Sequence, residues 1–500
     1  MSAEANSGSP PAAARTGLTW GDWLLVAAAI YFLSFKVVAL FMGAPHADEA
    51  YYWMWGQHPA WSYFDHPPFH AWLQGLAEQV FGWNLFALRI WSLVGAGLSL
   101  WIIALWTRRL APVGWRRNFV LGAALLYSAP LVTLYTTIAT NDRILFVCTI
   151  GALHFFAWFF ADWREGNRRY WALYLAAACV GLAALTKYYG ALIGLGAAIV
   201  ILSDRDLRAL LRTPHLYAAA ALSVLMQAPT IYWNLTHGMA SLRFHTMERA
   251  GVIDFSRLRV GETNTLLFET LVLLSPAAVI AILLLFAIRA GGGLHGPLLR
   301  MARWLFVLSS GFVLALSLWN HALFYWNLIA YAALFAVAFI VFRWRWLAWL
   351  QIVYGMVVGT VLLVQFSIHP ILSHPRADGI YGWPAIAEQV TATKQRYGAD
   401  LVGAPSWGVA SRLGFALGDR DVLAINAETD AFDYWTDYAA LAGKDVVILV
   451  EPGQERLLPY VGGHFSSFER VGEVLAESFG VPIKTYKIYL GRGFTAAPED

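Results

Sequence analysis

The stretch HADEAYYWMWGQHPAWSYFDHPPFHAWLQGL, from His46 to Leu76, holds three acidic residues, four histidines and nine aromatic rings between two far more apolar segments. Of the 500 residues in the chain, 59% are hydrophobic and only 13% are charged, whereas soluble domains are about half apolar and a quarter charged. The composition therefore indicates a membrane protein. The net charge of +3 is too small to suggest nucleic acid as a partner.

The apolar segments predict the membrane spans, since a crossing helix needs about 20 mainly apolar residues. About 11 segments meet this requirement, and they lie near 21–43, 85–106, 118–136, 143–161, 170–186, 189–203, 217–234, 265–288, 304–319, 322–341 and 346–366. The two cysteines, Cys148 and Cys179, lie inside these segments, so neither a disulfide framework nor a CxxC metal site is expected.

Arginine-rich loops predict the orientation. RRLAPVGWRR, WREGNRRY, DRDLRALLR, RAGGGLHGPLLRMAR and RWR alternate with loops poorer in Arg and Lys, and the positive-inside rule places these five in the cytoplasm. Residues 1–18 are then expected to be a disordered cytoplasmic N-terminus, with the first span as a signal anchor. The expected location is the bacterial inner membrane, with the tail outside the cytoplasm.

The tail, residues 367–500, is more polar than the rest of the chain. It contains four short strand-like runs, ADLVGAP, DVLAIN, DVVILV and KTYKIYLGRGF, with helical patterns between them. This alternation predicts a small α/β domain of about 130 residues. The predicted fold class is an α-helical polytopic membrane protein, with its membrane domain at 19–366 and a small C-terminal extracytoplasmic α/β domain.

The predicted topology brings several acidic residues to the outer face. Asp48 and Glu49 follow the end of the first span, in the external loop 44–84. A carboxylate there can act as a general base on a hydroxyl group, or it can merely end a helix in water. Asp142, in the motif TND, could likewise be a helix N-cap, and Asp65, before two prolines, could be a turn residue.

Basic residues on the same face could bind a phosphate that leaves with negative charge. They are His66, Arg89, Arg143, Lys187, Arg243 and Arg249. The alternative is attraction to anionic lipid headgroups. A function is favoured for Lys187, because it lies in a short break between two apolar spans. Lys36 lies inside the first span, where a charge is a functional candidate unless it snorkels to the surface.

Aromatic and histidine side chains in these loops have two interpretations each. Tyr51 and Tyr52 suit anchoring at the membrane interface, although one or two such rings could line a sugar site. Asp65, His66 and His245, together with His237, could hold a divalent metal ion such as zinc. These residues come from two loops without ligand spacing, so histidines hydrogen-bonded within loops are the alternative, and no cofactor is required.

The residues from DEAYYWMWGQHPAWSYFDHPP onward resemble a known superfamily, the protein mannosyltransferases and aminoarabinose transferases. These are multi-span glycosyltransferases of the GT-C class that use a polyprenyl-phosphate sugar. The first match is the external loop, and the later ones follow in the same order: TND, GLAALTKYYG, PTIYWNLTHGMASLRF, LFETLVLLSP and FYWNL, then DAFDYW and LAGKDVVILV in the tail. The resemblance covers nearly the whole chain.

The resemblance implies an activity and assigns roles. The expected activity is inverting transfer of a sugar from a polyprenyl-phosphate donor to an envelope glycolipid, other glycan or protein. The residues expected to be catalytic are Asp48, Glu49 and Asp142; those expected to bind the donor phosphate are Lys187, Arg243, His66 and Arg89; those expected to line the substrate site are Tyr51, Tyr52, Asp65, Asn234, His237 and Trp326.

The sequence departs from the aminoarabinose branch at two of these positions. His66 stands where that branch has a lysine after the acid, and Tyr51 stands where it has an arginine after DE. A histidine is a pH-dependent phosphate partner, which a lysine is not. The donor contacts of that branch therefore do not carry over unchanged, and neither does its sugar.

Two other classes of membrane protein are alternatives. A transporter or lipid flippase would place ionisable groups near the bilayer midplane and often shows inverted repeats. Here the acids lie at one surface, and no repeat is evident. The second alternative is a non-catalytic membrane scaffold with an external binding domain. Only the enzyme predicts glycosylation of an acceptor in vitro.

Overall fold

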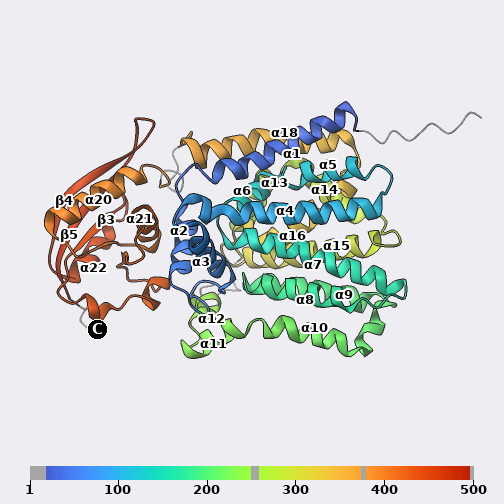
Figure 1. Ribbon diagram of the computed structural model, residues 1–500, viewed down its shortest axis with the longest axis horizontal. Helices are drawn as coiled ribbons and strands as arrows, with labels where there is room; N and C mark the ends of the chain where they lie inside the picture. Colours follow the sequence, from blue (N-terminus) through green and yellow to red (C-terminus); the bar gives the residue numbers. More distant parts are fainter. Residues whose placement is uncertain (1–17, 249–257, 373–378, 496–500) are drawn as a thin grey trace, which may run out of the picture.

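The computed structural model describes residues 18–248, 258–372 and 379–495. Long helices lie side by side in a bundle, and a smaller C-terminal domain covers one end of it (Figure 1). Helices α2 (Ala47–Gln57) and α3 (Phe69–Phe81) lie between the two parts. Nearly all of the expected disordered N-terminus, residues 1–17, lies outside the described residues, and so does Arg249.

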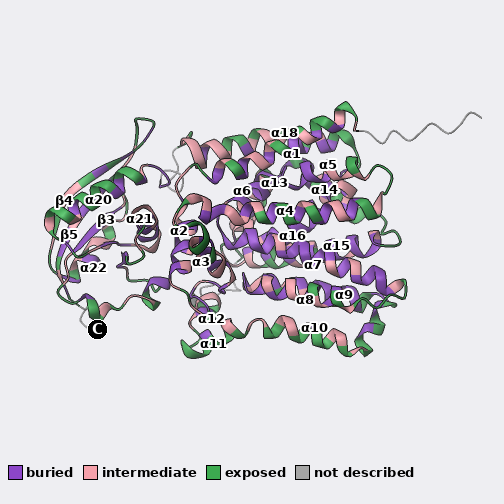
Figure 2. Cartoon of the chain, viewed as in Figure 1, coloured by how far each residue is buried: buried purple, intermediate pink, exposed green. Residues whose placement is uncertain are grey.

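Five helices of the bundle are long and apolar enough to cross a membrane, or seven if each of two bent pairs is one span. The five are α1 (Trp20–Ala39), α4 (Leu85–Leu110), α7 (Asn141–Arg164), α15 (His295–Ser317) and α18 (Arg345–Leu363), and the last continues to Ile368. The apolar window of α7 is 83% buried, against 33–44% for the other four. Helix α7 is therefore the most deeply buried of these five helices (Figure 2).

Two predicted spans are broken where a proline follows a polar or small residue. The expected span 118–136 forms α5 (Trp115–Leu126) and α6 (Pro130–Thr137), bent by 78°. The expected span 265–288 forms α13 (Val260–Leu274) and α14 (Pro276–Ala287), bent by 96°. Proline lacks the N–H that would continue the preceding helix, but it fits the first turn of a new one.

Four further apolar helices have only 10–17 residues. They are α8 (Tyr170–Ala184), the joined η1 and α9 (Tyr188–Ser203), α10 (Pro214–Leu225), and the joined η4 and α16 (Phe324–Ala336). The remaining short helices of this part are η2 (Leu207–Arg212), α11 (Ala228–Thr236), α12 (Ala240–Arg243), η3 (Phe244–Glu248), α17 (Ala338–Val341) and η5 (Val364–Ile368). Each is shorter than the ~20 residues of a straight crossing.

The C-terminal domain is built on a five-stranded sheet with strand order β2-β1-β3-β5-β4. Strands β1 (Leu401–Ala404), β2 (Leu423–Ala424) and β3 (Val446–Val450) are parallel, and β5 (Val481–Phe494) and β4 (Phe465–Ser478) extend the sheet antiparallel. Register pairs Val402 with Val447 and Ile448 with Tyr489. The helices of the domain are α20 (Trp383–Tyr397), η6 (Ala431–Tyr434), η7 (Tyr438–Leu441), η8 (Glu455–Leu457), α22 (Leu458–Gly463) and α21 (Trp407–Leu417).

One hydrophobic core joins the external loop to the C-terminal domain. It contains Trp53 and Trp55 from α2 together with Leu413 from α21 and Phe432 from η6. These four side chains are fully buried. Burying one large apolar side chain stabilises the folded state by about 1.5–3 kcal/mol. The polar segment from His46 to Leu76, which contains α2, is thus packed between the bundle and the domain (Figure 1).

Candidate active site

A cavity of about 820 Å³ lies where the bundle end, the external loop and the C-terminal domain meet. Its polar wall includes Asp48, Asp65 and His66 from the loop, Asp142 from α7 and Lys187 from the break before η1. Its apolar wall comes from α9 and α15 and consists of Leu192, Leu195, Phe312 and Leu316. The cavity therefore suits an amphiphile with a polar end near the acids.

Asp48 is positioned by the first turn of α2. His46 is the N-cap of this helix, and Glu49 completes a capping box with the N-cap backbone. The Asp48 side chain is 39% exposed, and its carboxylate lies 3.8 Å from His46 Nδ1. The carboxylate of Asp48 is therefore open to the cavity and to a molecule bound there.

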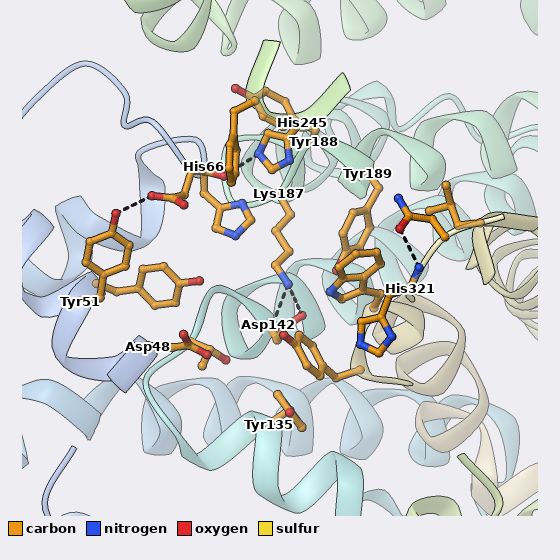
Figure 3. A pocket seen from close by; sticks show the side chains of 18 of the residues that line it. Asp48, Tyr51, His66, Tyr135, Asp142, Lys187, Tyr188, Tyr189, His245 and His321 are labelled. Carbon is orange, nitrogen blue, oxygen red and sulfur yellow. Dashed lines mark hydrogen bonds and ion pairs between the residues drawn. The ribbon is translucent and has the colours of Figure 1, made fainter. Parts of the chain in front are cut away.

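Asp142 and Lys187 form a buried ion pair at the cavity wall. Lys187 Nζ donates to both carboxylate oxygens of Asp142, at 2.8 and 2.7 Å, and both side chains are 5% exposed or less. In Figure 3, Lys187 reaches toward Asp142, with Asp48 and Tyr135 beside the pair. Lys187 Nζ also lies 5.4 Å from the ring centres of Tyr189 and Tyr325.

Tyr51 connects the loop to the C-terminal domain. Its hydroxyl donates to Asp65 Oδ2 at 2.6 Å and accepts from the backbone N–H of Ala431 at 2.8 Å. Burial and the neighbouring Asp65 raise the pKa of Tyr51 well above its ordinary value, so the phenol keeps its proton. Tyr51 therefore lines the cavity and also joins α2 to the C-terminal domain.

The C-terminal domain contributes its own acids to the cavity. The segment Glu428, Thr429 and Asp430 lines it, together with Trp407. Burial raises the pKa of Asp430 to about 7, although hydrogen bonds from Asn426 and from the Phe432 backbone oppose the shift. Asp430 can therefore change protonation near neutral pH.

The histidines of the two loops meet in the cavity wall. The rings of His66 and His245 lie 5.6 Å apart between centres, and His245 Nε2 donates to the backbone carbonyl of Asp65 at 2.6 Å. Across residues 18–248, 258–372 and 379–495, no group of three or more His, Cys, Asp or Glu is arranged to hold a metal ion. The predicted metal set of Asp65, His66 and His245 is thus not assembled as ligands.

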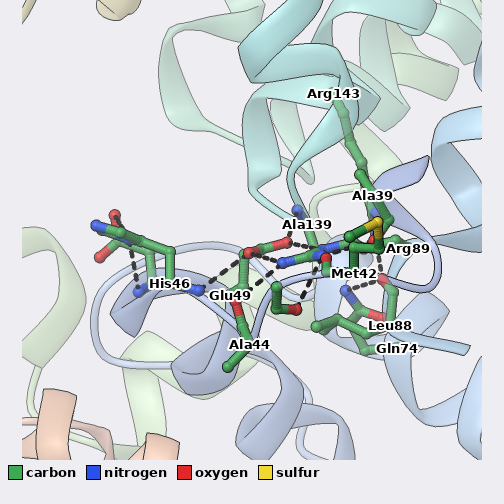
Figure 4. A network of polar contacts seen from close by, with 12 residues as sticks. Ala39, Met42, Ala44, His46, Glu49, Gln74, Leu88, Arg89, Ala139 and Arg143 are labelled. Carbon is green, nitrogen blue, oxygen red and sulfur yellow. Dashed lines mark hydrogen bonds and ion pairs between the residues drawn. The ribbon is translucent and has the colours of Figure 1, made fainter. Parts of the chain in front are cut away.

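Glu49 and Arg89 occupy a different environment from Asp48. Arg89 donates to both oxygens of Glu49, at 2.8 and 2.7 Å, and also to the backbone carbonyls of Ala39 and Met42 (Figure 4). Glu49 in turn accepts from the backbone N–H of Ala139 at 2.7 Å. Both side chains are under 5% exposed, and neither lines the main cavity. Both line the second cavity described below, and their contacts fix this part of its wall. The catalytic role of Glu49 and the phosphate-binding role of Arg89 stay predictions.

Three other expected residues lie away from the main cavity. The Asn234 side chain donates to Thr230 and accepts from the Leu242 backbone, which holds the turn between α11 and α12. His237 stacks on Trp233, with ring centres 4.3 Å apart. Arg243 is exposed on α12. The cavity wall instead includes Tyr52 and Trp326, which were expected, and Tyr135, Tyr325 and Trp407, which were not.

A second cavity, of about 600 Å³, meets the first at Asp48. The two share four residues, Asp48, Tyr135, Tyr325 and Trp407. The second is lined by α1, α6 and α18, with His46, Arg412 and Glu451 at its polar end. FYWNL was the sequence signal that could have identified Tyr325; Tyr135 and Trp407 carry no comparable motif.

Comparison with known proteins finds similarity in sequence to glycosyltransferases. Residues 65–233 match the family model of dolichyl-phosphate-mannose-protein mannosyltransferase. The lipid A galacturonosyltransferase RgtD of Rhizobium johnstonii is 25% identical over 390 residues, which is 74% of this chain and 77% of that protein. An undecaprenyl phosphate-alpha-4-amino-4-deoxy-L-arabinose arabinosyl transferase of Pseudomonas fluorescens is 34% identical over 135 residues, 26% of this chain and 22% of that protein.

The fold agrees with the sequence matches. ArnT from Cupriavidus metallidurans, in the apo state, superposes with a TM-score of 0.61 at 16% identity, covering 94% of this chain and 98% of that one. The same protein bound to undecaprenyl phosphate gives a TM-score of 0.59. The chain is thus similar in sequence to glycosyltransferases that include a protein mannosyltransferase family and RgtD, and its fold is similar to that of ArnT.

Proposed function

We propose that the protein transfers a sugar from a polyprenyl-phosphate donor to an acceptor in the bacterial cell envelope, such as lipid A or another envelope glycolipid. The observation that carries the proposal is the position of Asp48 at the boundary of two cavities. A two-substrate transfer needs a basic group in reach of both substrates, and a general base must lie within hydrogen-bond distance of the proton it takes.

The donor fits the larger cavity. Its apolar wall can receive the isoprenoid chain, and Lys187 lies where the phosphate would sit. His66 and His245 lie in the same wall and are the further candidates for contact with the phosphate. ArnT from Cupriavidus metallidurans has been solved with undecaprenyl phosphate, which supports a lipid of this class here.

The acceptor fits the second cavity, and the chemistry is a single displacement. Asp48 takes the proton of the acceptor hydroxyl while the acceptor oxygen bonds to the anomeric carbon. The bond from that carbon to the phosphate oxygen breaks, and its electron pair leaves on the polyprenyl phosphate. Lys187, held by Asp142, stabilises this charge. The anomeric centre inverts, and no step requires a metal ion.

We also propose the topology. The 11 spans of this proposal are the five long helices, the two bent pairs and the four short apolar helices. The membrane domain is 19–366, with the external loop 44–84; the N-terminus is cytoplasmic and the domain 367–500 is periplasmic. A transporter would place its ionisable groups near the bilayer midplane, whereas Asp48 and Asp65 line a cavity together with residues 428–430 of the C-terminal domain.

The test is reconstitution followed by mass spectrometry. Purified protein in liposomes is given undecaprenyl-phosphate sugars and an envelope lipid extract. The expected product is an acceptor heavier by one sugar residue, formed also after dialysis against EDTA. The same mass difference is expected between envelope glycolipids of cells with and without the protein. Movement of donor across the bilayer without any glycosylated product would instead support a flippase.

A further inference from the structure

Lys36 is a fully buried lysine in the last turn of α1. Its Nζ donates to the backbone carbonyl and the hydroxyl of Thr136, both at 2.8 Å, and to the hydroxyl of Thr137 at 3.3 Å. It also lies 4.7 Å from the ring centre of Tyr127. In the described part of the chain, no ion pair joins Lys36 to a carboxylate. Its three donors are therefore directed at uncharged groups of one segment.

That segment is the C-terminal end of α6, a half-helix that ends at Thr137 inside the bundle. The last carbonyls of a helix have no partner within it, and the dipole makes that end negative. A lysine donor satisfies both needs at once. Because taking a charge out of water costs several kcal/mol, an intramembrane lysine is retained where the position has a use.

The end of α6 leads directly into the catalytic groups. Tyr135, in its last turn, lines both cavities. Ala139 follows, and its N–H donates to Glu49 at 2.7 Å while its carbonyl accepts from His70 at 3.0 Å. Asp142 lies in the first turn of α7 three residues later. Lys36 is therefore the contact that fixes this connection from the side of α1.

We propose that Lys36 is a positioning residue for the transfer reaction: by holding the end of α6, it sets where Tyr135 and Asp142 stand relative to Asp48. The inference rests on the proposed function. It assigns Lys36 no contact with substrate. A displacement of reacting groups by about 1 Å can lower the rate about 100-fold. Loss of the Lys36 contact is therefore expected to lower kcat.

The principal variant is Lys36→Met, which keeps an unbranched chain of similar length and removes the donors. We expect kcat to fall by about 10–100-fold and the KM for the donor to change by less than about threefold. The melting temperature in detergent should not fall, because replacing a buried charge with an apolar group is often neutral or stabilising. Thr137→Val removes one of the three acceptors of Lys36, together with the bond from the Thr137 hydroxyl to the Thr133 carbonyl, and should lower kcat by a smaller factor.

Two further measurements separate positioning from general structure. In Lys36→Met, amide hydrogen exchange should rise in peptides covering 135–142 and stay unchanged in α15. The double variant Lys36→Met with Thr137→Val should lose less rate than the product of the two single effects, since the two variants share one removed contact. The control is Ser34→Ala on the same helix, where the hydroxyl donates only to the Tyr31 carbonyl; wild-type kcat is expected.

Each outcome decides the inference. A Lys36→Met protein with kcat within about threefold of wild type, or one whose kcat and melting temperature fall together, would overturn it. If the wild type transfers no sugar from any donor, the proposed function fails; the exchange of 135–142 then still decides whether Lys36 fixes this segment.

Discussion

Asp48 and Glu49 are adjacent in the sequence, but their side chains lie in different environments. Asp48 is 39% exposed at the junction of two cavities, whereas Glu49 is 1% exposed and bonded to Arg89. Successive helical residues point about 100° apart, so neighbours in DE face different surroundings. The sequence predicted a functional acid pair. It did not predict which member faces the main cavity, because the orientation of α2 is set by packing against the C-terminal domain.

Glu49→Gln is expected to destabilise the fold. Removing this charge leaves the Arg89 guanidinium buried without a counter-ion, which costs about 3–5 kcal/mol. Burial raises the pKa of Glu49, but Arg89 and two backbone hydrogen bonds outweigh it, and the net pKa lies below the ordinary value of 4.5. The carboxylate therefore stabilises the wild type above that pH and loses this contribution as the pH falls through the lowered pKa. Thermal unfolding in detergent at pH 7 should show a lower melting temperature for the variant; equal melting temperatures would contradict the role.

Lys187→Ala is expected to impair donor use more than acceptor use. The phosphate gains charge as the bond to the sugar breaks, so kcat and kcat/KM for the donor should both fall. Lys187→Arg should restore only part of the rate, because a planar guanidinium does not replace a compact ammonium in a confined wall. Saturation curves measured separately for donor and acceptor distinguish this from simple lipid binding, for which donor kinetics in detergent stay normal.

At the level of elements, the C-terminal domain completes the site. Its segment 428–430 lines the main cavity, and Tyr51 connects it to α2 through Asp65 and the Ala431 backbone. These contacts join residues about 380 positions apart in the chain, and local patterns carry no information about such pairings. Patterns in the sequence therefore predicted a domain outside the membrane. They did not predict that its residues Glu428 and Asp430 line the main cavity.

The strands were predictable where apolar residues run together or alternate with polar ones. β1, β2, β3 and β5 overlap the four strand-like runs of the tail. β4 (Phe465–Ser478) was not predicted, because it is an edge strand whose residues are mainly exposed or half-buried and include three glutamates. The bends after α5 and α13 were also missed, since hydropathy reads 118–136 and 265–288 as continuous; Pro130 and Pro276 are the residues that mark them.

Asp430 should make stability depend on pH in the neutral range. Its pKa rises from 3.8 to about 7 on folding, mainly through burial. The folded state then holds the proton more tightly than the unfolded state, so stability is greatest at acid pH and falls as the pH rises toward 7, by up to about 4 kcal/mol. In Asp430→Asn this fall between pH 5 and pH 7 should disappear.

The control for this prediction is Asp421→Asn, at an exposed aspartate of the same domain, which should keep the wild-type pH dependence. Unfolding followed by tryptophan fluorescence at several pH values provides the measurement. An Asp430→Asn protein that still loses stability between pH 5 and pH 7 would show that another group is responsible.

At the level of the whole molecule, the proposed orientation puts both cavities on the outer side of the membrane. Cys148 and Cys179 are first replaced, and single cysteines are then introduced at Ser466, on exposed β4, and at Arg117, at the opposite end of the bundle. A membrane-impermeant thiol reagent added to intact spheroplasts should label the first and not the second. The reverse pattern would place the site in the cytoplasm and contradict the use of a donor presented outside.

The central claim is that Asp48 acts on the acceptor during sugar transfer, with the donor and the acceptor bound in the two cavities that meet at this residue. Purified wild-type protein and Asp48→Asn are compared in proteoliposomes with a labelled polyprenyl-phosphate sugar and an envelope lipid extract, with melting temperatures measured in parallel. We expect Asp48→Asn to keep its fold and to transfer sugar at least about 100-fold more slowly, as loss of a general base predicts. A correctly folded Asp48→Asn protein that transfers sugar within about threefold of the wild-type rate would show that Asp48 is not the general base, and would contradict the proposed mechanism.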